Sequence, residues 1–284
     1  MRFLTCLALA IGLVLPLGTF AGYAQSFSDP QRSEIEKIIR EYLVQHPEVL
    51  QEAIAELEKK QASDEAAKHQ AAVKDNASAI FNSPRQVVTG NPQGDVTFVE
   101  FFDYNCGYCK RAMSDMFDLL KHDPKLKVVL KEFPVLGPGS VEAARVAVAV
   151  RMQDKTGKKY MEFHQKLLGG RGQADKARAL AVAKEVGFDM TRLERDMTSD
   201  EVKQTLEESF KLAEKLGLNG TPSYVIGDNV VVGAVGLDAL KENPGRSIVT
   251  GGLLTRYFLF KHLAAVMVLS AGVGCVAAAN CNYQ

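Results

Sequence analysis

The sequence predicts an α/β domain with an inserted helical domain, preceded by an α-helical arm. Three observations support this fold class. The apolar run Val96–Phe102 alternates and indicates a buried strand, which leads directly into a helical pattern over 110–121. Residues 140–216 then carry helical patterns with no convincing strand among them. Two further strands, at 223–227 and 230–235, close the domain, and this order is typical of an α/β unit with a helical insertion.

The first 24 residues have the composition of an export signal. Arg2 supplies a positive end, residues 3–17 form an apolar body, and Gly22 and Ala24 are small residues before a cleavage site. A membrane anchor is the alternative, but the segment is short. We therefore expect residues 1–24 to be a signal peptide, and the mature chain to enter an oxidising compartment, the bacterial periplasm.

Residues 25–62 are expected to form a helical arm, with Asp29 as N-cap, Pro30 in the first turn and a break at His46-Pro47. Each side of the break carries one apolar stripe: Ile35, Ile38, Ile39, Tyr42 and Leu43, and then Val49, Leu50, Ala53, Ile54 and Leu57. Helices of this length are marginal alone in water, so the stripes need a partner, either the chain's own main domain or another copy. Self-association is favoured because residues 63–83 are predicted to be a polar linker that holds the arm away.

The main domain is predicted over residues 84–243. Strands are expected at 86–89, 96–102 and 125–133, with turn-rich residues at 90–94. The helical insertion spans about 139–217, with helices expected at 141–152, 160–168, 174–186, 190–197 and 201–216. A short helix is expected to follow the last strand, from Leu237.

The segment Cys106-Gly107-Tyr108-Cys109 lies where a strand ends and a helix begins. Unpaired backbone N–H groups and the positive end of the helix dipole stabilise a thiolate at such a position. The pKa of the first cysteine is then expected to fall from about 8.5 into the range of roughly 3.5 to 7.5. The two-residue spacing lets Cys109 reach back and close a small disulfide ring. We therefore predict that this dithiol exchanges disulfides with other proteins.

Metal binding is the alternative interpretation of a C-x-x-C pair. Zinc requires four ligands, but the five histidines are scattered and no second C-x-x-C follows, so we expect no metal and no other cofactor. A reduced pair could nevertheless hold Cu(I). Basic and acidic residues number 34 each, and this balance excludes an electrostatic surface for nucleic acid.

The order strand, Cys-Gly-Tyr-Cys, helix, strand, inserted helices, Gly220-Thr221-Pro222 and hairpin resembles the thioredoxin fold in its DsbA-like form, over roughly residues 84–243. The resemblance implies that Cys106 and Cys109 are the reactive pair, with Cys106 as the attacking thiolate. It also implies that Pro222 is the cis-proline beside the disulfide. Its missing N–H leaves the preceding backbone free to pair with a bound substrate strand.

Glu100, six residues before Cys106, matches the buried acid of this family. A carboxyl group among Val and Phe side chains is expected to have a pKa raised by desolvation, and to shuttle a proton to and from Cys109. The alternative is that Glu100 faces solvent from the strand.

The Gly107-Tyr108 dipeptide and Thr221 resemble the isomerase branch of the family, and the arm is similar to the oligomerising stalks of DsbC-like and ScsC-like proteins. We expect a periplasmic disulfide isomerase that forms a homo-oligomer, with Tyr108, Thr221 and Pro222 at the substrate-binding site. Its partners would be exported client proteins with cysteines and a membrane redox partner that resets the pair, without nucleic acid. A DsbA-like disulfide oxidase and a Cu(I)-binding protein of copper tolerance are the alternatives.

Residues 244–284 form an apolar tail that departs from the family. Asn243-Pro244-Gly245 is expected to end the last helix early, and the apolar run 263–279 is, at about 17 residues, at the lower limit for crossing a bilayer. A membrane anchor is disfavoured because basic residues precede the run on the outer side. A second export signal, an altered reading of the gene's end, or packing of 253–269 in place of the truncated helix are the other interpretations. Cys275 and Cys281 could pair, and we assign them no function.

Overall fold

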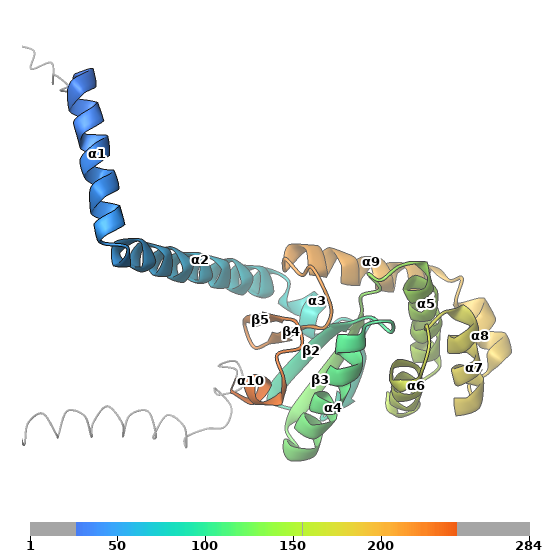
Figure 1. The fold of residues 1–284 in the computed structure, drawn as a ribbon. Helices are drawn as coiled ribbons and strands as arrows, with labels where there is room; N and C mark the ends of the chain where they lie inside the picture. Colours follow the sequence, from blue (N-terminus) through green and yellow to red (C-terminus); the bar gives the residue numbers. More distant parts are fainter. Residues whose placement is uncertain (1–26, 155, 243–284) are drawn as a thin grey trace, which may run out of the picture. The chain divides into compact units, whose positions relative to one another are not determined.

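The computed structural model describes residues 27–154 and 156–242 (Figure 1). The predicted signal peptide and the apolar tail, with Cys275 and Cys281, lie outside the described residues. The chain divides into two compact units, residues 1–60 and 61–284, which are described separately below.

The described part of the first unit consists of α1, Asp29–Gln45, and the first half of α2, Glu48–Asp75. The N-cap of α1 is Ser28 rather than the predicted Asp29, and Gln31 Oε1 accepts the Ser28 backbone N–H over 2.9 Å. Asp29 becomes the first helical residue, where its negative charge meets the positive end of the helix. The predicted break at His46-Pro47 is present between the two helices.

The apolar side chains of the arm are exposed. No residue of α1 is buried. The exposed side chains include most of both predicted stripes: Ile35, Ile38, Ile39, Tyr42, Leu50, Ile54 and Leu57, all between 37% and 57% exposed. Within the described chain, these stripes therefore have no apolar cover.

The predicted linker, residues 63–83, is mostly helical. Helix α2 continues through residue 62 to Asp75, and the short helix α3 spans Ala77–Phe81. The physical reason is composition, because residues 48–82 are rich in Ala, Lys, Glu and Gln and contain no Gly or Pro. Val73 and Ile80 are buried in the second unit, so the end of this segment belongs to the core of the main domain.

The sheet of the second unit has five strands in the order β1-β3-β2-β4-β5. Their bounds are Val87–Gly90 for β1, Val96–Phe102 for β2, Leu126–Glu132 for β3, Ser223–Ile226 for β4 and Asn229–Val232 for β5. Strand β2 runs parallel to β3 and antiparallel to β4, which places it at the centre of the sheet. The two strands that flank the turn-rich residues 90–94 are not neighbours, since β1 pairs with β3.

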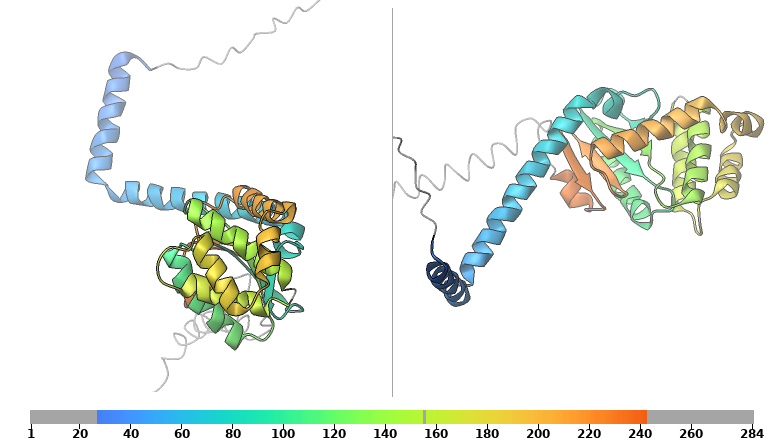
Figure 2. Two further views of the ribbon diagram at one scale, coloured as in Figure 1. Left: turned by 90° about the vertical axis from the view of Figure 1, so that its right-hand side faces the viewer. Right: turned by 90° about the horizontal axis from the view of Figure 1, so that it is seen from above.

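Helices cover both faces of this sheet. Helix α4, Gly107–His122, and the short α10, Leu237–Lys241, pack together on one face. Helix α9, Asp200–Lys215, covers the other face with α3. The remaining helices are α5, Pro138–Gln153; α6, Lys158–Gly169; α7, Lys176–Val186; and α8, Met190–Asp196. They stand together at one side of the sheet (Figures 1 and 2).

The alternation predicted for Val96–Phe102 separates two cores. Phe98 and Phe102 pack with the α4 side and the inserted helices, whereas Val99 and Phe101 pack with α3 and α9. Successive side chains of a strand point to opposite faces, so Glu100 shares the α4 face with Phe98 and Phe102. Among the described residues, no helix is long and apolar enough to cross a membrane.

Candidate active site

Cys106 joins the central strand to helix α4. It is the N-cap of that helix, with an extended backbone, and its sulfur accepts the backbone N–H of Cys109 over 3.2 Å. Both thiols are free, and both residues are buried, Cys106 at 6% and Cys109 at 0% exposure. The predicted placement of the pair at a strand-to-helix junction is therefore present, with Cys106 nearer to solvent.

The two thiols have opposite acidities. The pKa of Cys106 is lowered to about 6, first by a hydrogen bond with the Cys109 side chain and also by the Thr221 side chain and backbone N–H groups, while burial opposes this shift. Burial raises the pKa of Cys109, and the hydrogen bond with Cys106 raises it further. At neutral pH, Cys106 is the sulfur that carries negative charge, and Cys109 holds its proton.

The loop before β4 lies against Cys106. The Thr221–Pro222 peptide bond is cis. The Cys106 thiol can donate to the Thr221 backbone oxygen at 3.2 Å. Ser223, the next residue, pairs with Phe101 of β2, so the pairing of β4 with the central strand brings this loop to the dithiol.

Glu100 lies beneath the pair in the same central strand. It is 2% exposed, with Leu130 of β3 on one side in the register and Tyr224 of β4 on the other. Its pKa is raised to about 8, first by burial and then by the charges of Cys106 and Asp115. The solvent-facing alternative for Glu100 is thus wrong, whereas its action as a proton shuttle stays a prediction.

Tyr108, between the two cysteines, is 60% exposed. The guanidinium carbon of Arg111 lies 4.3 Å from the centroid of its ring, which is within cation–π range. Tyr108 therefore presents an ordered aromatic surface beside Cys106.

Sequence reasoning missed the polar contacts that hold the loop before Cys106. Buried Asp103 accepts hydrogen bonds from the Asn105 N–H at 2.7 Å, the Ser140 hydroxyl at 2.8 Å and the Leu136 N–H at 2.9 Å. Asn105 pairs with the backbone of Ala174 in both directions, at 2.7 and 2.8 Å. The dithiol loop is thereby fixed to α5 and to the segment before α7. The Asp-x-Asn spacing is a turn signal, but the distant partners of these two side chains, 33 to 69 residues away, cannot be recognised from the local sequence.

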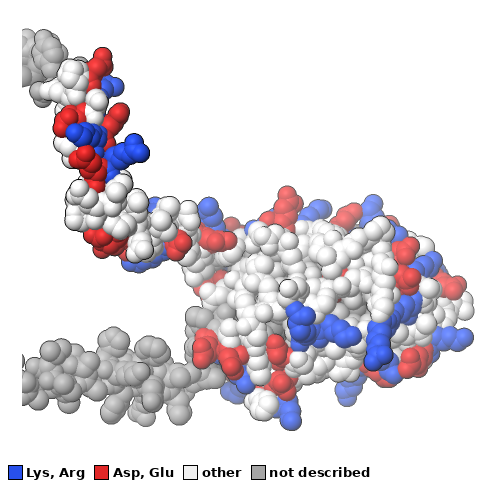
Figure 3. All heavy atoms as spheres, in the orientation of Figure 1, with Lys and Arg blue, Asp and Glu red and all other residues white. Residues whose placement is uncertain are grey.

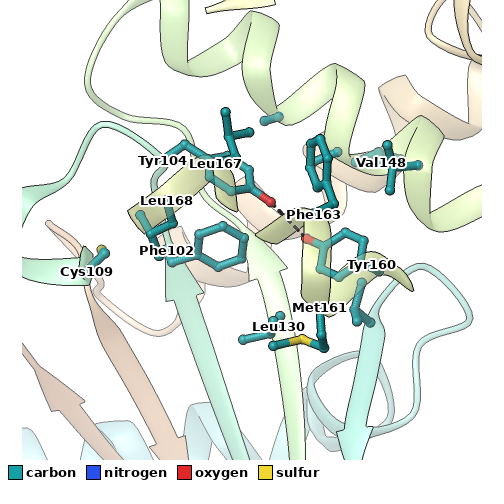
Figure 4. Close-up of a cluster of buried hydrophobic side chains, with 14 of the residues drawn as sticks. Phe102, Tyr104, Cys109, Leu130, Val148, Tyr160, Met161, Phe163, Leu167 and Leu168 are labelled. Atoms are coloured by element: carbon teal, nitrogen blue, oxygen red, sulfur yellow. Dashed lines mark hydrogen bonds between the residues drawn. The ribbon is translucent and has the colours of Figure 1, made fainter. Parts of the chain in front are cut away.

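A second missed feature is a buried polar cluster behind this loop, of which Figure 4 shows the hydrogen bond between Tyr104 and Tyr160. Glu132 accepts the Tyr160 hydroxyl at 2.8 Å, and the Tyr104 hydroxyl lies 3.2 Å from that of Tyr160 and 3.3 Å from Nδ1 of His164. Burial raises the pKa of Glu132 well above its usual range and lowers that of His164 to about 3. Burial therefore favours the neutral form of both groups, and the cluster links the dithiol loop to α6.

Chemically, the site offers one ionised sulfur and one protonated sulfur next to it. A thiolate is the form that attacks a disulfide, and a neighbouring thiol can resolve the mixed disulfide. Within residues 27–154 and 156–242, no group of three His, Cys, Asp or Glu side chains is placed to hold a metal ion.

Comparison with known families agrees with this geometry. The family described as DSBA-like thioredoxin domain matches residues 97–243, which is more than half of the chain. The chain therefore belongs to the DSBA-like thioredoxin domain family, and the thioredoxin fold predicted from its sequence is confirmed. The family described as copper resistance protein ScsC N-terminal domain matches residues 31–63, which include most of the arm.

Solved structures resemble the chain over different lengths. A thioredoxin-like oxidoreductase from Silicibacter pomeroyi DSS-3 is 44% identical, with a TM-score of 0.58, and covers 63% of this chain and 99% of its own. Proteus mirabilis ScsC in a transitional conformation is 31% identical, with a TM-score of 0.55, and covers 76% of this chain and 94% of its own. The match to ScsC therefore covers more of this chain than the match to the Silicibacter pomeroyi protein does.

Curated relatives match about half of this chain at lower identity. Disulfide bond formation protein D of Bacillus subtilis is 28% identical over 172 residues, which cover 55% of this chain and 74% of that protein. The Na(+)/H(+) antiporter NhaA 1 of Salinispora arenicola is 25% identical over 158 residues. The chain spans only 24% of the length of that antiporter.

Proposed function

We propose that this protein is a thiol–disulfide oxidoreductase of exported proteins, acting as an oligomeric disulfide isomerase. One observation carries the proposal. The pKa of Cys106 is lowered to about 6, and the Cys106 sulfur lies 3.2 Å from the backbone oxygen of Thr221, the residue before the cis-proline. A thiolate supplies the nucleophile, and the loop supplies backbone groups for an extended client segment.

In the proposed reaction, the Cys106 thiolate attacks one sulfur of a client disulfide. A bond forms between Cys106 and that sulfur, and the other client sulfur leaves as a thiolate that takes up a proton. In isomerisation, a second client thiolate then attacks the mixed disulfide and releases Cys106 reduced. Alternatively, Cys109 gives up its proton and attacks Cys106, which releases the reduced client and leaves the protein oxidised.

In this proposal, Glu100 transfers a proton and the Thr221–Pro222 loop contacts the client. Cys109 must lose a proton to attack, and its raised pKa makes that step unfavourable without a base. Buried Glu100, with a pKa of about 8, can accept and return a proton near neutral pH. Thr221, Pro222 and the exposed Tyr108 would contact the client on either side of Cys106.

The arm supports the isomerase assignment. Within the described residues, the apolar side chains on α1 and α2 are exposed, and association of copies would remove them from water. Active sites held together in this way can act on one misfolded client and exclude a re-oxidising membrane partner. The match of residues 31–63 to an ScsC N-terminal domain is consistent with this use of the arm.

A disulfide oxidase is the second candidate, because one relative is named as a disulfide bond formation protein. The two candidates share the site and differ in which redox form is maintained. An oxidase must be kept as a disulfide by a membrane redox partner, whereas an isomerase must be kept reduced. The composition of residues 1–24 favours the periplasm as the location in both cases.

The test is refolding of scrambled ribonuclease by the reduced protein, with Cys106→Ser as the inactive control. We expect the unmodified protein, but not Cys106→Ser, to restore ribonuclease activity. Equal recovery with Cys106→Ser would overturn the proposal. Equilibration with glutathione then separates the candidates. A reduction potential of about −180 mV or below favours isomerase or reductase, and a value near −120 mV favours oxidase.

A further inference from the structure

Four basic side chains lie near the dithiol, and none of them takes part in the proposed disulfide exchange. Lys110 and Arg111 follow Cys109 directly in α4, Arg171 lies in the segment after α6, and Arg178 is in the first turn of α7. In Figure 3, Lys and Arg side chains gather over the start of α4 and the neighbouring α6. We call these four residues the basic rim.

Contacts hold the basic rim together at Gly170. The Lys110 ammonium donates to the Gly170 backbone oxygen over 2.8 Å. The Arg178 guanidinium lies so close over Gly170 that a side chain at this position would collide with it. Two cations from separate helices therefore meet at one residue. The hydrogen bond restrains Lys110 before any partner binds, which reduces the entropy lost on binding.

In the part of the chain that the structure describes, the charges of the basic rim are not paired with carboxylates. Among the described residues, none of the four forms an ion pair with a carboxylate. Arginines elsewhere in the same domain do so: Arg85 and Arg151 both pair with Glu201, at 3.2 and 2.6 Å, and Arg192 pairs with Asp196 at 3.1 Å. The acidic residues of α4, Asp115 and Asp118, lie further along that helix. The start of α4 and the segments after α6 thus carry four cations that form no ion pair among the described residues, although the chain as a whole has no net charge.

We propose that the basic rim selects client disulfides that are flanked by carboxylates, so that the partner is an acidic polypeptide segment. This inference rests on the proposed function, since it concerns the same sulfur. A fixed positive surface beside a reacting atom raises the local concentration of anionic substrates and the rate of their encounter. Such an effect weakens with added salt, because exposed charges are screened.

The test uses two synthetic peptides, each with one internal disulfide, that differ only in having glutamates or lysines next to the cysteines. In each reaction, the Cys106 thiolate attacks a peptide sulfur and displaces the other as a thiolate. Cys109 loses its proton and attacks Cys106, which forms the protein disulfide and releases the peptide as a dithiol. The protein dithiol loses two electrons, and the peptide disulfide gains them. Samples are quenched with acid and alkylated, and mass spectrometry then measures the masses of the alkylated peptide and protein.

The key variant is Lys110→Gln with Arg171→Gln, which removes two charges at exposed positions. At low ionic strength, we expect its rate with the acidic peptide to fall by about threefold or more, and its rate with the basic peptide to rise. The ratio of the two rates is compared between variant and unmodified protein, so the intrinsic reactivity of each peptide cancels.

Two controls accompany this comparison. Lys110→Arg with Arg171→Lys keeps both charges and should restore the unmodified ratio. Lys211→Gln removes an exposed charge from α9, on the opposite face of the sheet, and should leave the ratio unchanged.

Suppose that the Lys110→Gln, Arg171→Gln variant still reduces both peptides and that the ratio of its rates with the acidic and the basic peptide is unchanged. This result would overturn the selection by charge and leave the proposed function intact. Equal slowing with both peptides would also overturn it, because a structural defect does not discriminate by charge. Failure to reduce either peptide by the unmodified protein would instead contradict the proposed function and the selection together.

Discussion

The backbone N–H of Cys109 donates a hydrogen bond to the sulfur of Cys106 over 3.2 Å, so the attacking atom is also the cap of helix α4. The N-terminus of a helix has unsatisfied N–H groups, and a negative sulfur satisfies them better than a neutral thiol does. The start of the helix therefore adds to the acidity of Cys106, whose largest cause is the hydrogen bond with the Cys109 side chain.

Glu100→Gln is expected to slow disulfide exchange at neutral pH without abolishing it. Glutamine keeps the shape of the buried side chain but cannot accept the proton of Cys109, whose raised pKa makes that proton hard to lose. The attack by Cys106 does not require this transfer. Rates of peptide disulfide reduction between pH 5 and pH 9 would test the prediction, and a pH–rate profile identical to that of the unmodified protein would remove Glu100 from the mechanism.

Glu100 is also expected to make the protein less stable as pH rises. The pKa in the folded state is about 8 against 4.5 for the free group, so the folded state binds more protons between these values. Stability attributable to Glu100 is thus present below pH 4.5 and is lost as pH rises through 8. The loss is on the order of 5 kcal/mol at most.

Urea denaturation of the reduced protein at several pH values would measure this effect. The difference in unfolding free energy between Glu100→Gln and the unmodified protein should grow in favour of the variant from pH 5 to pH 8. A constant difference across that range would show that Glu100 ionises as an ordinary carboxyl.

Much of the fold was predictable because it depends on local patterns. The alternation of Val96–Phe102 and the helical spacing in 110–121 fix a strand and a helix around Cys106, as the structure has them. The pairing of β1 with β3, by contrast, joins Val87 to Leu130, a contact between residues far apart in the sequence that no local pattern encodes. The helices over 63–83 were not predicted because polar composition does not separate a solvated helix from a spacer.

The site, like the fold, combines features that the local sequence predicts with features that depend on long-range packing. Cys106, Cys109 and Pro222 are marked by their types and spacing, and the buried position of Glu100 follows from its strand face. Asp103 and Asn105 were overlooked because their partners, Ser140 and Ala174, are brought to them only by the packing of the inserted helices.

Asn105→Ala is expected to destabilise the protein by roughly 1–3 kcal/mol, because it leaves the Ala174 N–H and C=O without their partner. Urea denaturation measures this cost, with Asn219→Ala as a control at an exposed asparagine. We also expect faster proteolysis of the segment around Ala174. Equal stability of both variants would show that these hydrogen bonds do not anchor the loop.

Ile38→Glu combined with Ile54→Glu is expected to reduce the native mass to that of one chain. Both side chains are more than half exposed, at 57% and 55%, and a charge on each opposes burial against another copy. Sedimentation equilibrium measures the mass, and Glu36→Lys, which changes charge on α1 without removing an apolar side chain, is the control. The self-association proposal fails if the unmodified protein already sediments as a single chain.

The most direct test of the central claim is the pH dependence of Cys106 alkylation in the Cys109→Ala variant and the unmodified reduced protein. In the unmodified protein, the rate with iodoacetamide should follow a single titration with a midpoint near pH 6. Loss of the Cys109 thiol removes the largest cause of the shift, so the midpoint should rise in the variant. A midpoint near 8.5 in the unmodified protein, the value of an ordinary cysteine, would contradict the account.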